Sequence, residues 1–313
     1  MNQSHQHIAD STAQTPLQDP PFTALVLGGG GSAGNAWLIG VIAGLCEAGL
    51  DVTAADLIIG TSAGSTAAAQ IAGAAPADLL ASVLAASPAP RTGSTGTPAG
   101  PVPMTPASTQ MEATSAIIAA SEDVADMRRR LCAWARESEA TSDGSAQARW
   151  RATVAARLPN QRWPQRRMLI TAVDADTGEP VVFDRHSGVD LADAVAASCS
   201  SGFAYRIGGS RYIDGGYRTN ADNADLAAGH ARVLVLSPLA GRSRTPVQWG
   251  THLATQVEQL RARGSRVETV FPDRDSRAAF GDNMMDQSTR PPTARAGLKQ
   301  GRALAEQLTD FWR

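Results

Sequence analysis

Short apolar runs alternate along this chain with segments of helical periodicity. Residues 23–27 and 56–59 are apolar runs of strand length, and each leads into a turn that contains glycine. After the first turn, apolar residues recur at helical spacing from Trp37 to Leu45, and Gly49 stands where such a helix would end. Strand, helix, strand and helix in succession predict a parallel sheet covered by helices on both faces.

The pattern changes after the second helix. Residues 76–86 predict a helix, whereas residues 87–109 are a low-complexity mixture of Pro, Ala, Gly, Ser and Thr, which predicts a surface loop or disordered insertion. Residues 112–139 and 149–158 are again predicted to be helical, with a polar, small-residue stretch between them. We interpret residues 76–160 as an insertion in the sheet, either a cap beside a functional site or a surface elaboration.

After the insertion, predicted strands and helices alternate again, and this pattern indicates the domain organisation. Strands are predicted at 167–173, 180–184, 232–236 and 267–271, and helices at 191–197, 251–263 and 294–312. The whole pattern predicts an α/β three-layer sandwich with a mostly parallel central sheet between helices. We expect one domain at residues 22–240, a C-terminal extension at 241–313 packed on it, and a disordered tail at 1–21.

Composition narrows the class of protein. The 313 residues carry a formal charge of −2, which argues against a nucleic-acid-binding protein. No signal peptide and no apolar run of membrane-spanning length is evident. The three cysteines, Cys46, Cys132 and Cys199, show no metal-binding or CxxC spacing and are typical of buried, reduced thiols. We therefore expect a cytoplasmic protein with no metal site.

Two stretches, residues 128–134 and 149–167, mix arginines with tryptophans. Such segments can lie at an anionic membrane surface. A solvated helix face whose aromatic residues pack on the core is the more common explanation of this pattern. Transient membrane contact is therefore a secondary expectation, and no nucleic-acid partner is expected.

The segment from Gly60 to Gly64 has the G-x-S-x-G pattern, with Ser62 at its centre, between an apolar run and a small-residue helix. This pattern presents a nucleophilic hydroxyl on a sharp strand-to-helix turn. The glycines allow the strand and the helix to approach closely, and the helix N-terminus favours negative charge beside the serine. Ser62 is therefore the candidate nucleophile.

A glycine-rich loop follows the first strand. Gly28 to Gly31 can turn their main-chain amides toward one point, and such a concavity binds anionic oxygen. Gly29, Gly31 and Gly34 also satisfy the G-x-G-x-x-G dinucleotide fingerprint. That fingerprint requires an acidic residue at the end of the second strand, and here this strand ends in G-x-S-x-G. We therefore expect no cofactor.

A carboxylate and two histidines are candidates for the base. Asp214 follows a short apolar strand and precedes Gly215 and Gly216, a pattern that by itself predicts an Asp-Gly hairpin turn. His230 and His252 lie after Asp214, so the Ser–Asp–His order of an α/β-hydrolase triad is available. Neither histidine lies in a motif-like context.

The glycine loop, G-x-S-x-G and Asp-Gly-Gly, in this order, resemble the patatin-like phospholipases, a family of serine lipid acyl hydrolases. The similarity covers residues 23–85 and 163–240. The resemblance implies a dyad without histidine, in which Asp214 accepts the proton of Ser62. It also implies that the amides of Gly29, Gly30 and Gly31 hold the oxyanion, with a lipid or acyl ester as substrate.

The chain departs from the family pattern at a few positions. Ala33 stands where the family often has a basic residue, and Ser201, Ala204 and Tyr205 stand where prolines are common. Two alternatives to the dyad stay open. One is a Ser–His–Asp esterase that uses His230 or His252. The other, which the departures at Ala33 and Ser201 support, is a catalytically weak protein of the same fold that binds lipids or acyl groups.

Overall fold

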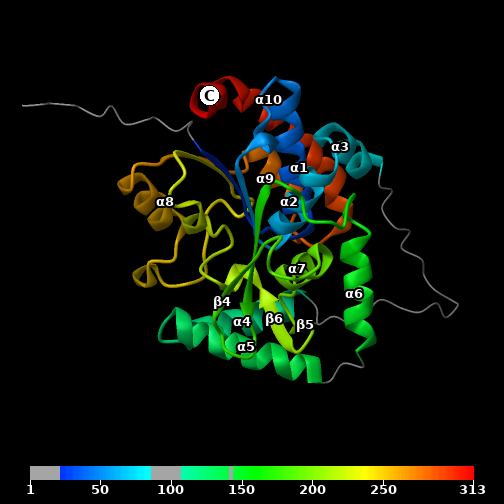
Figure 1. Cartoon of the computed structure of the whole chain (residues 1–313), viewed down its shortest axis with the longest axis vertical. Helices are drawn as coiled ribbons and strands as arrows, with labels where there is room; N and C mark the ends of the chain where they lie inside the picture. Colours follow the sequence, from blue (N-terminus) through cyan, green and yellow to red (C-terminus); the bar gives the residue numbers. More distant parts are fainter. Residues whose placement is uncertain (1–21, 86–106, 141–143) are drawn as a thin grey trace, which may run out of the picture.

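Runs of leucine, isoleucine and valine form an eight-stranded sheet at the centre of the computed structural model, which describes residues 22–85, 107–140 and 144–313 (Figure 1). The strands are β1 (Thr23–Leu27), β2 (Leu57–Gly60), β3 (Arg167–Asp174), β4 (Pro180–Phe183), β5 (Tyr205–Ile207), β6 (Ser210–Asp214), β7 (Arg232–Leu236) and β8 (Arg266–Val270). Their order is β5-β6-β3-β2-β1-β7-β8, with β4 also paired to β3. The pairs along β3-β2-β1-β7-β8 are parallel, and those of β4 and β6 with β3 and of β5 with β6 are antiparallel. The mostly parallel sheet is as predicted.

Helices cover both faces of the sheet and complete three layers. The helices are α1 (Gly31–Glu47), α2 (Ala63–Gly73), α3 (Pro76–Ala85), α4 (Ala107–Ala119), α5 (Val124–Ala140), α6 (Ser145–Ala155), α7 (Leu191–Ser198), α8 (Leu253–Ala262), α9 (Arg274–Phe280) and α10 (Arg290–Trp312). Short 3-10 turns are η1 (Val52–Ala54), η2 (Gly215–Tyr217), η3 (Ala224–Ala227), η4 (Val247–Trp249) and η5 (Gln287–Thr289). In Figure 1, α1, α2 and α10 lie on one side of the strands and α8 on the other.

The alternation of side chains along the strands divides the core between these faces. In β1, Leu25 and Leu27 enter the larger core, which α1, α2 and α7 share, while Ala24 and Val26 enter the smaller core beneath α8. All four side chains are completely buried. The strands therefore read as continuous apolar runs, as expected for a sheet covered on both faces.

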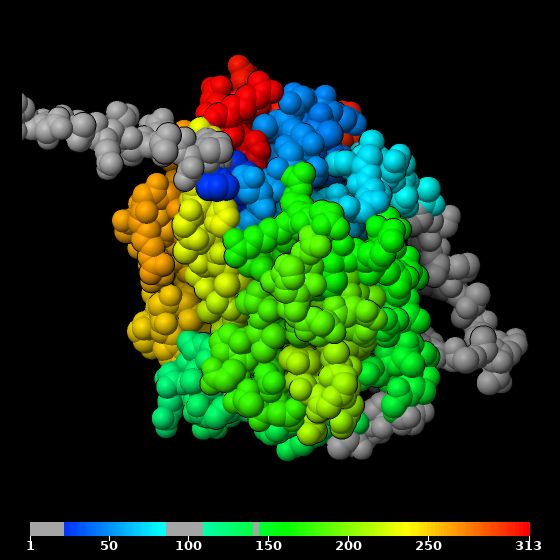
Figure 2. Space-filling view, viewed as in Figure 1, coloured from blue at the N-terminus to red at the C-terminus, as the bar shows by residue number. Residues whose placement is uncertain are grey.

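The C-terminal helix α10 packs against α1, and glycines allow their main chains to touch. A methyl group at Gly44 of α1 would lie 2.3 Å from the carbonyl oxygen of Leu298. A methyl group at Gly301 of α10 would lie 2.2 Å from the carbonyl oxygen of Val41. Figure 2 shows the C-terminal residues, in red, beside the blue residues of the first helices. The helix thus shares the core of the first strand–helix unit.

The insertion differs from its predicted helical pattern. The single helix predicted at 112–139 is two helices, α4 and α5, and α4 begins within the stretch predicted to be a loop. The break has a local cause, because the side chain of Asp123 accepts a hydrogen bond from the amide of Asp126 (2.7 Å) and caps α5. The rest of the predicted loop, residues 87–106, lies outside the described residues, and so do the predicted tail at 1–21 and residues 86 and 141–143.

The cysteines are all free, but their predicted burial is only partly correct. Cys132 is buried and Cys199 is half-buried, whereas Cys46 near the end of α1 is exposed. Burial raises the pKa of the Cys199 thiol to about 11, which keeps this thiol protonated at neutral pH.

The tryptophans of the second cationic stretch pack on the core. The indole of Trp150 donates to the carbonyl of Ala196 (3.1 Å), and that of Trp163 donates to Val189 (2.7 Å). Packing thus explains both residues, and membrane contact stays a prediction. Among the described residues, no helix has the length and apolar character needed to span a membrane.

Candidate active site

A sharp turn at Ser62 joins β2 to α2. Ser62 has φ 52° and ψ −117°, a conformation that costs a residue other than glycine on the order of 1–3 kcal/mol. Hydrogen bonds hold the turn: the Ser62 amide donates to Ser198 Oγ (2.9 Å), and the Ser65 hydroxyl donates to the Ser62 carbonyl (2.6 Å). The turn presents the Ser62 hydroxyl at the carboxyl end of β2 and at the N-terminus of α2.

The two glycines of this motif permit contacts between main chains. A methyl group at Gly60 would lie 2.6 Å from Cα of Ser65, across the turn. A methyl group at Gly64 would lie 1.9 Å from the carbonyl oxygen of Leu27 at the end of β1. Any larger residue at Gly64 would therefore separate α2 from the sheet.

The sheet register brings Asp214 to this turn. Asp214 ends β6 and pairs with Ala172 of β3, while Ile170 of β3 pairs with Gly60 of β2. One strand therefore separates the carboxylate from the strand that leads to Ser62. The Ser62 hydroxyl donates a hydrogen bond to Asp214 Oδ2 at 2.9 Å. The structure thus joins two sequence-predicted residues that lie 152 positions apart.

Asp214 is only 6% exposed, and its two carboxyl oxygens have separate partners. Oδ1 accepts a hydrogen bond from the Gly216 amide (2.8 Å), and Oδ2 accepts the one from Ser62. Burial raises the pKa of Asp214 to about 6, although both hydrogen bonds oppose this shift. The carboxylate is therefore a stronger base than an exposed aspartate, yet ionised at neutral pH.

The glycine loop lies directly beside Ser62. A methyl group at Gly29 would lie 3.5 Å from Cβ of Ser62. The Gly28 amide donates to the carbonyl of Leu236 in β7 (3.0 Å), and Gly31 adopts φ 61°, which favours glycine. The loop is thus anchored to the sheet before it enters α1.

Not all the loop amides are available to a ligand. The Gly29 amide donates to the carbonyl of Ala221 (2.8 Å), so Gly29 supports the loop in this conformation, in contrast to its predicted role as an oxyanion donor. Within the described residues, the amides of Gly30, Gly31 and Ala63 have no acceptor. The free amide of Ala63, which follows Ser62, has no signal in the sequence, because every residue except proline carries the same group.

The two candidate histidines have other contacts. A ring nitrogen of His230 lies 3.1 Å from the carbonyl oxygen of Ala227, and Nε2 of His252 lies 2.7 Å from that of Thr245. Neither contact joins a histidine to Ser62 or Asp214. The Ser–His–Asp alternative is therefore not assembled in this structure.

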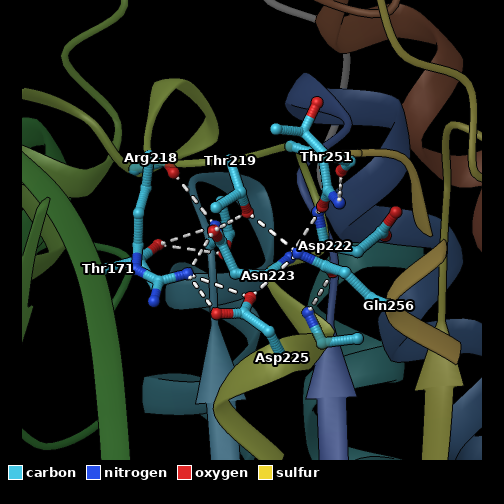
Figure 3. A network of polar contacts seen from close by, with 12 residues as sticks. Thr171, Arg218, Thr219, Asp222, Asn223, Asp225, Thr251 and Gln256 are labelled. Atoms are coloured by element: carbon cyan, nitrogen blue, oxygen red, sulfur yellow. Dashed lines mark hydrogen bonds and ion pairs between the residues drawn. The ribbon is translucent and has the colours of Figure 1, made fainter. Parts of the chain in front are cut away.

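Asn223 ties the turn after β6 to the nucleophile turn (Figure 3). Its side-chain nitrogen donates to Thr61 Oγ1 (2.9 Å) and to the Gly215 carbonyl (3.0 Å). Its side-chain oxygen accepts from Thr219 Oγ1 (2.8 Å) and from Arg218 Nη1 (3.1 Å). Asn223 is fully buried, with φ 53°, a conformation that asparagine tolerates. No local sequence signal marks Asn223 as a site residue.

Asn223→Ala should lower the free energy of unfolding by about 2–4 kcal/mol, because it leaves several buried polar groups without a hydrogen-bond partner at once. Urea unfolding monitored by circular dichroism measures this change. The exposed Asn160 is a matched control, since its side chain accepts one hydrogen bond from the Arg162 amide. Equal losses for Asn223→Ala and Asn160→Ala would contradict the role of Asn223 as a central connection.

The first turn of α1 is contacted by a cation from α10. Arg290 donates to the Ser32 carbonyl (3.1 Å) and to Asn35 Oδ1 (3.1 Å). Burial lowers the pKa of Arg290 to about 10. Ala33, which departs from the family pattern in this turn, has a fully buried side chain. Ala33 itself carries no charge, but the guanidinium of Arg290, from α10, contacts the same turn of α1.

Ser201, the second departure, connects the insertion to the site. Its hydroxyl accepts a hydrogen bond from Gln110 Nε2 of α4 (2.8 Å), and its carbonyl accepts one from the Tyr217 hydroxyl (3.2 Å). Tyr217 ends η2, which directly follows Asp214. These contacts place α4 next to the turn that carries the carboxylate.

The glycine loop, the turn at Ser62 and the turn after Asp214 all lie in a region that is similar to known proteins. The family model of the patatin-like phospholipases matches residues 25–227, a range that includes all three. Among solved structures, the crystal structure of the type III effector protein ExoU is similar at 14% identity and a TM-score of 0.33, over 92% of this chain and 54% of that one. The chain thus spans about half the length of that structure. No curated protein matches the chain significantly.

Proposed function

This chain belongs to the patatin-like phospholipase family, and from that premise we propose that it is a serine lipid acyl hydrolase acting through Ser62 and Asp214. One observation carries the proposal: the 2.9 Å hydrogen bond from the Ser62 hydroxyl to a buried carboxylate, made at a strained turn. A hydroxyl bonded to a base beside free main-chain amides is the arrangement that acyl transfer requires.

In the proposed reaction, Ser62 Oγ attacks the ester carbonyl carbon while its proton moves to Asp214 Oδ2. The carbonyl oxygen becomes an oxyanion, for which the amides of Gly30, Gly31 and Ala63 are the proposed donors. The C–O bond to the alcohol then breaks, and Asp214 returns the proton to the departing oxygen. Water, deprotonated by Asp214, attacks the acyl-enzyme, and the acid leaves as Ser62 recovers its proton.

Two exposed methionines, one beside the glycine loop and one on α4, support a lipid substrate. Met285 is 50% exposed, and a methyl group at Gly31 would lie 2.8 Å from its sulfur. Met111 of α4, the helix that contacts Ser201, is 56% exposed. Flexible thioether side chains adapt to acyl chains of varied shape. We therefore propose an acyl chain as the group that these residues contact.

A fluorophosphonate probe tests the proposal against the lipid-binding alternative. The native protein should be labelled at Ser62, as identified by peptide mass spectrometry, and Ser62→Ala should be unlabelled. A combined His230→Gln and His252→Gln variant should be labelled at the native rate, since neither histidine contacts the dyad. Absence of labelling in the native protein would favour a non-catalytic binding protein, and its loss in the histidine variant would favour a triad.

The acidic limb of the pH–rate profile should report Asp214. Only the ionised carboxylate accepts a proton, so kcat/KM should rise as pH increases through about 6, the value to which burial raises the pKa of Asp214. Stability moves in the opposite direction, because the stabilising protonated form is lost as pH rises from the unfolded pKa, near 4, to about 6. Initial rates with a p-nitrophenyl acyl ester from pH 5 to 7 measure the limb. A rate independent of pH in this range would contradict this role of Asp214.

A further inference from the structure

A second buried carboxyl, which the proposed reaction does not use, packs beneath the glycine loop. Asp222 is 2% exposed, and its Oδ1 is a buried atom without a hydrogen-bond partner among the described residues. A methyl group at Gly28 would lie 2.2 Å from Oδ1, so this oxygen rests directly on Cα of Gly28. In Figure 3, Asp222 lies beside the polar network around Asn223, and no hydrogen bond is drawn between the Asp222 carboxyl and this network.

Little in the surroundings of Asp222 could stabilise a negative charge. Three segments supply its polar and close neighbours: the loop after β1 with Gly28, the end of β7 with Ser237, and its own turn, where the Asp222 amide donates to Asn220 Oδ1 (2.7 Å). No charged side chain contributes to its pKa, and among the described residues it forms no ion pair. The Ser237 hydroxyl is the one group that favours ionisation.

Burial without a counter-charge makes the uncharged acid the stable form. An isolated carboxylate in such an environment takes up a proton rather than bear the cost of desolvation. Burial accordingly raises the pKa of Asp222 to about 7. Ionisation above this pH would place a negative charge against Gly28, in the same loop whose amides are proposed to bind an oxyanion.

We propose that Asp222 is a positioning residue that supports the glycine loop as an uncharged carboxyl, and that its ionisation displaces the loop and lowers activity. The part of this proposal that concerns activity rests on the proposed function. The part that concerns the charge of Asp222 in the folded protein does not.

The variant Asp222→Asn tests whether Asp222 is uncharged in the folded protein, and this test needs no measurement of activity. The amide has nearly the shape of the protonated acid, since its oxygen can face Gly28 and its nitrogen can donate to Ser237, but it does not ionise. The melting temperature of Asp222→Asn, relative to native protein, should rise between pH 5 and pH 8. The sign follows because a raised carboxyl pKa stabilises the fold at low pH, and this stabilisation is lost as pH rises through about 7. A difference that is constant over this range, as expected for the exposed control Asp310→Asn, would overturn the proposal.

The activity profile tests the consequence for the loop. For the native protein, kcat/KM should fall as pH rises through about 7. At pH 8 about one Asp222 carboxyl in eleven would remain protonated, so the rate should be about tenfold below that of the fully protonated form. Asp222→Asn should retain the rate, and so should exceed the native protein about tenfold at pH 8. An unchanged alkaline limb in Asp222→Asn, or loss of activity at every pH in a folded variant, would overturn the proposal.

Ser237→Ala provides a second variant with Asp222 intact. It removes the hydroxyl that favours ionisation, so the alkaline limb should move to higher pH. A limb that stays in place or moves to lower pH would count against the proposal, even if Asp222→Asn does not fold. If no variant hydrolyses esters, the proposed function fails, while the melting temperatures still decide whether Asp222 is uncharged in the folded protein.

Discussion

Asp214→Asn is expected to lower kcat/KM for p-nitrophenyl acyl esters by about 10³- to 10⁴-fold, the scale seen when a catalytic dyad or triad loses its carboxylate. The amide has the size of the carboxylate, and its oxygen can still accept the Gly216 amide. Its nitrogen, however, donates to Ser62 Oγ, so it cannot accept the proton of that hydroxyl. Initial rates near pH 7, where most of the native Asp214 carboxylate is ionised, measure this difference.

The fold of Asp214→Asn should remain intact, which separates loss of chemistry from loss of structure. Burial raises the pKa of Asp214 to about 6, so the native charge at pH 8 destabilises the fold, and the neutral variant should melt at an equal or higher temperature. Asp310→Asn on the exposed side of α10 is the control for removal of one negative charge. More than a tenth of the native kcat/KM in Asp214→Asn would end the dyad model.

Gly64→Ala is expected to lower the free energy of unfolding by at least about 3 kcal/mol, at the upper end for overpacking. The added methyl group would lie 1.9 Å from the carbonyl oxygen of Leu27 and 2.8 Å from that of Gly28. Both atoms belong to main chain at the end of β1, so no rotation of a side chain relieves the overlap. The whole of α2 would have to move away from the sheet, and Ser62 would move with it.

Gly209→Ala provides the matched control. Gly209 lies in the turn between β5 and β6, its added methyl group meets nothing within 4 Å, and its φ is not in the left-handed region. Alanine there should change stability by no more than about 0.5 kcal/mol, as at other surface positions. Thermal and urea unfolding of the two variants measure the contrast. Similar stability of both would show that the contact between α2 and β1 is not close.

Much of the fold could be predicted because its signals are local. The strand predicted at 232–236 is β7, since a strand buried on both faces is a continuous apolar run. The helix predicted to end near Gly49 is α1, and Gly49 has φ 87°, as expected after a helix C-terminus. The break between α4 and α5 could not be predicted from the sequence. Asp123 caps α5 because the chain turns there, and an aspartate by itself does not mark such a turn.

Ser62 and Asp214 could be selected as candidates because glycines mark both turns. Asn223, Ser198 and Asp222 could not, because nothing local separates them from other polar residues. Their importance comes from partners far along the chain: Ser198 accepts the amide of Ser62, 136 positions away, and Asn223 contacts Thr61, 162 positions away. The availability of main-chain amides was equally hidden, as the bonded Gly29 and the free Ala63 illustrate.

The sequence by itself determined the layered α/β architecture, the strand-to-helix turn at Ser62 and the glycine turn after Asp214, because each depends on residues that are neighbours in the chain. Only the tertiary structure decided which base meets the hydroxyl, which amides stay unbonded and which carboxyl is buried without a charged partner. These properties depend on strand register and on contacts between distant segments, and the free energy of a polar group depends on what surrounds it in space.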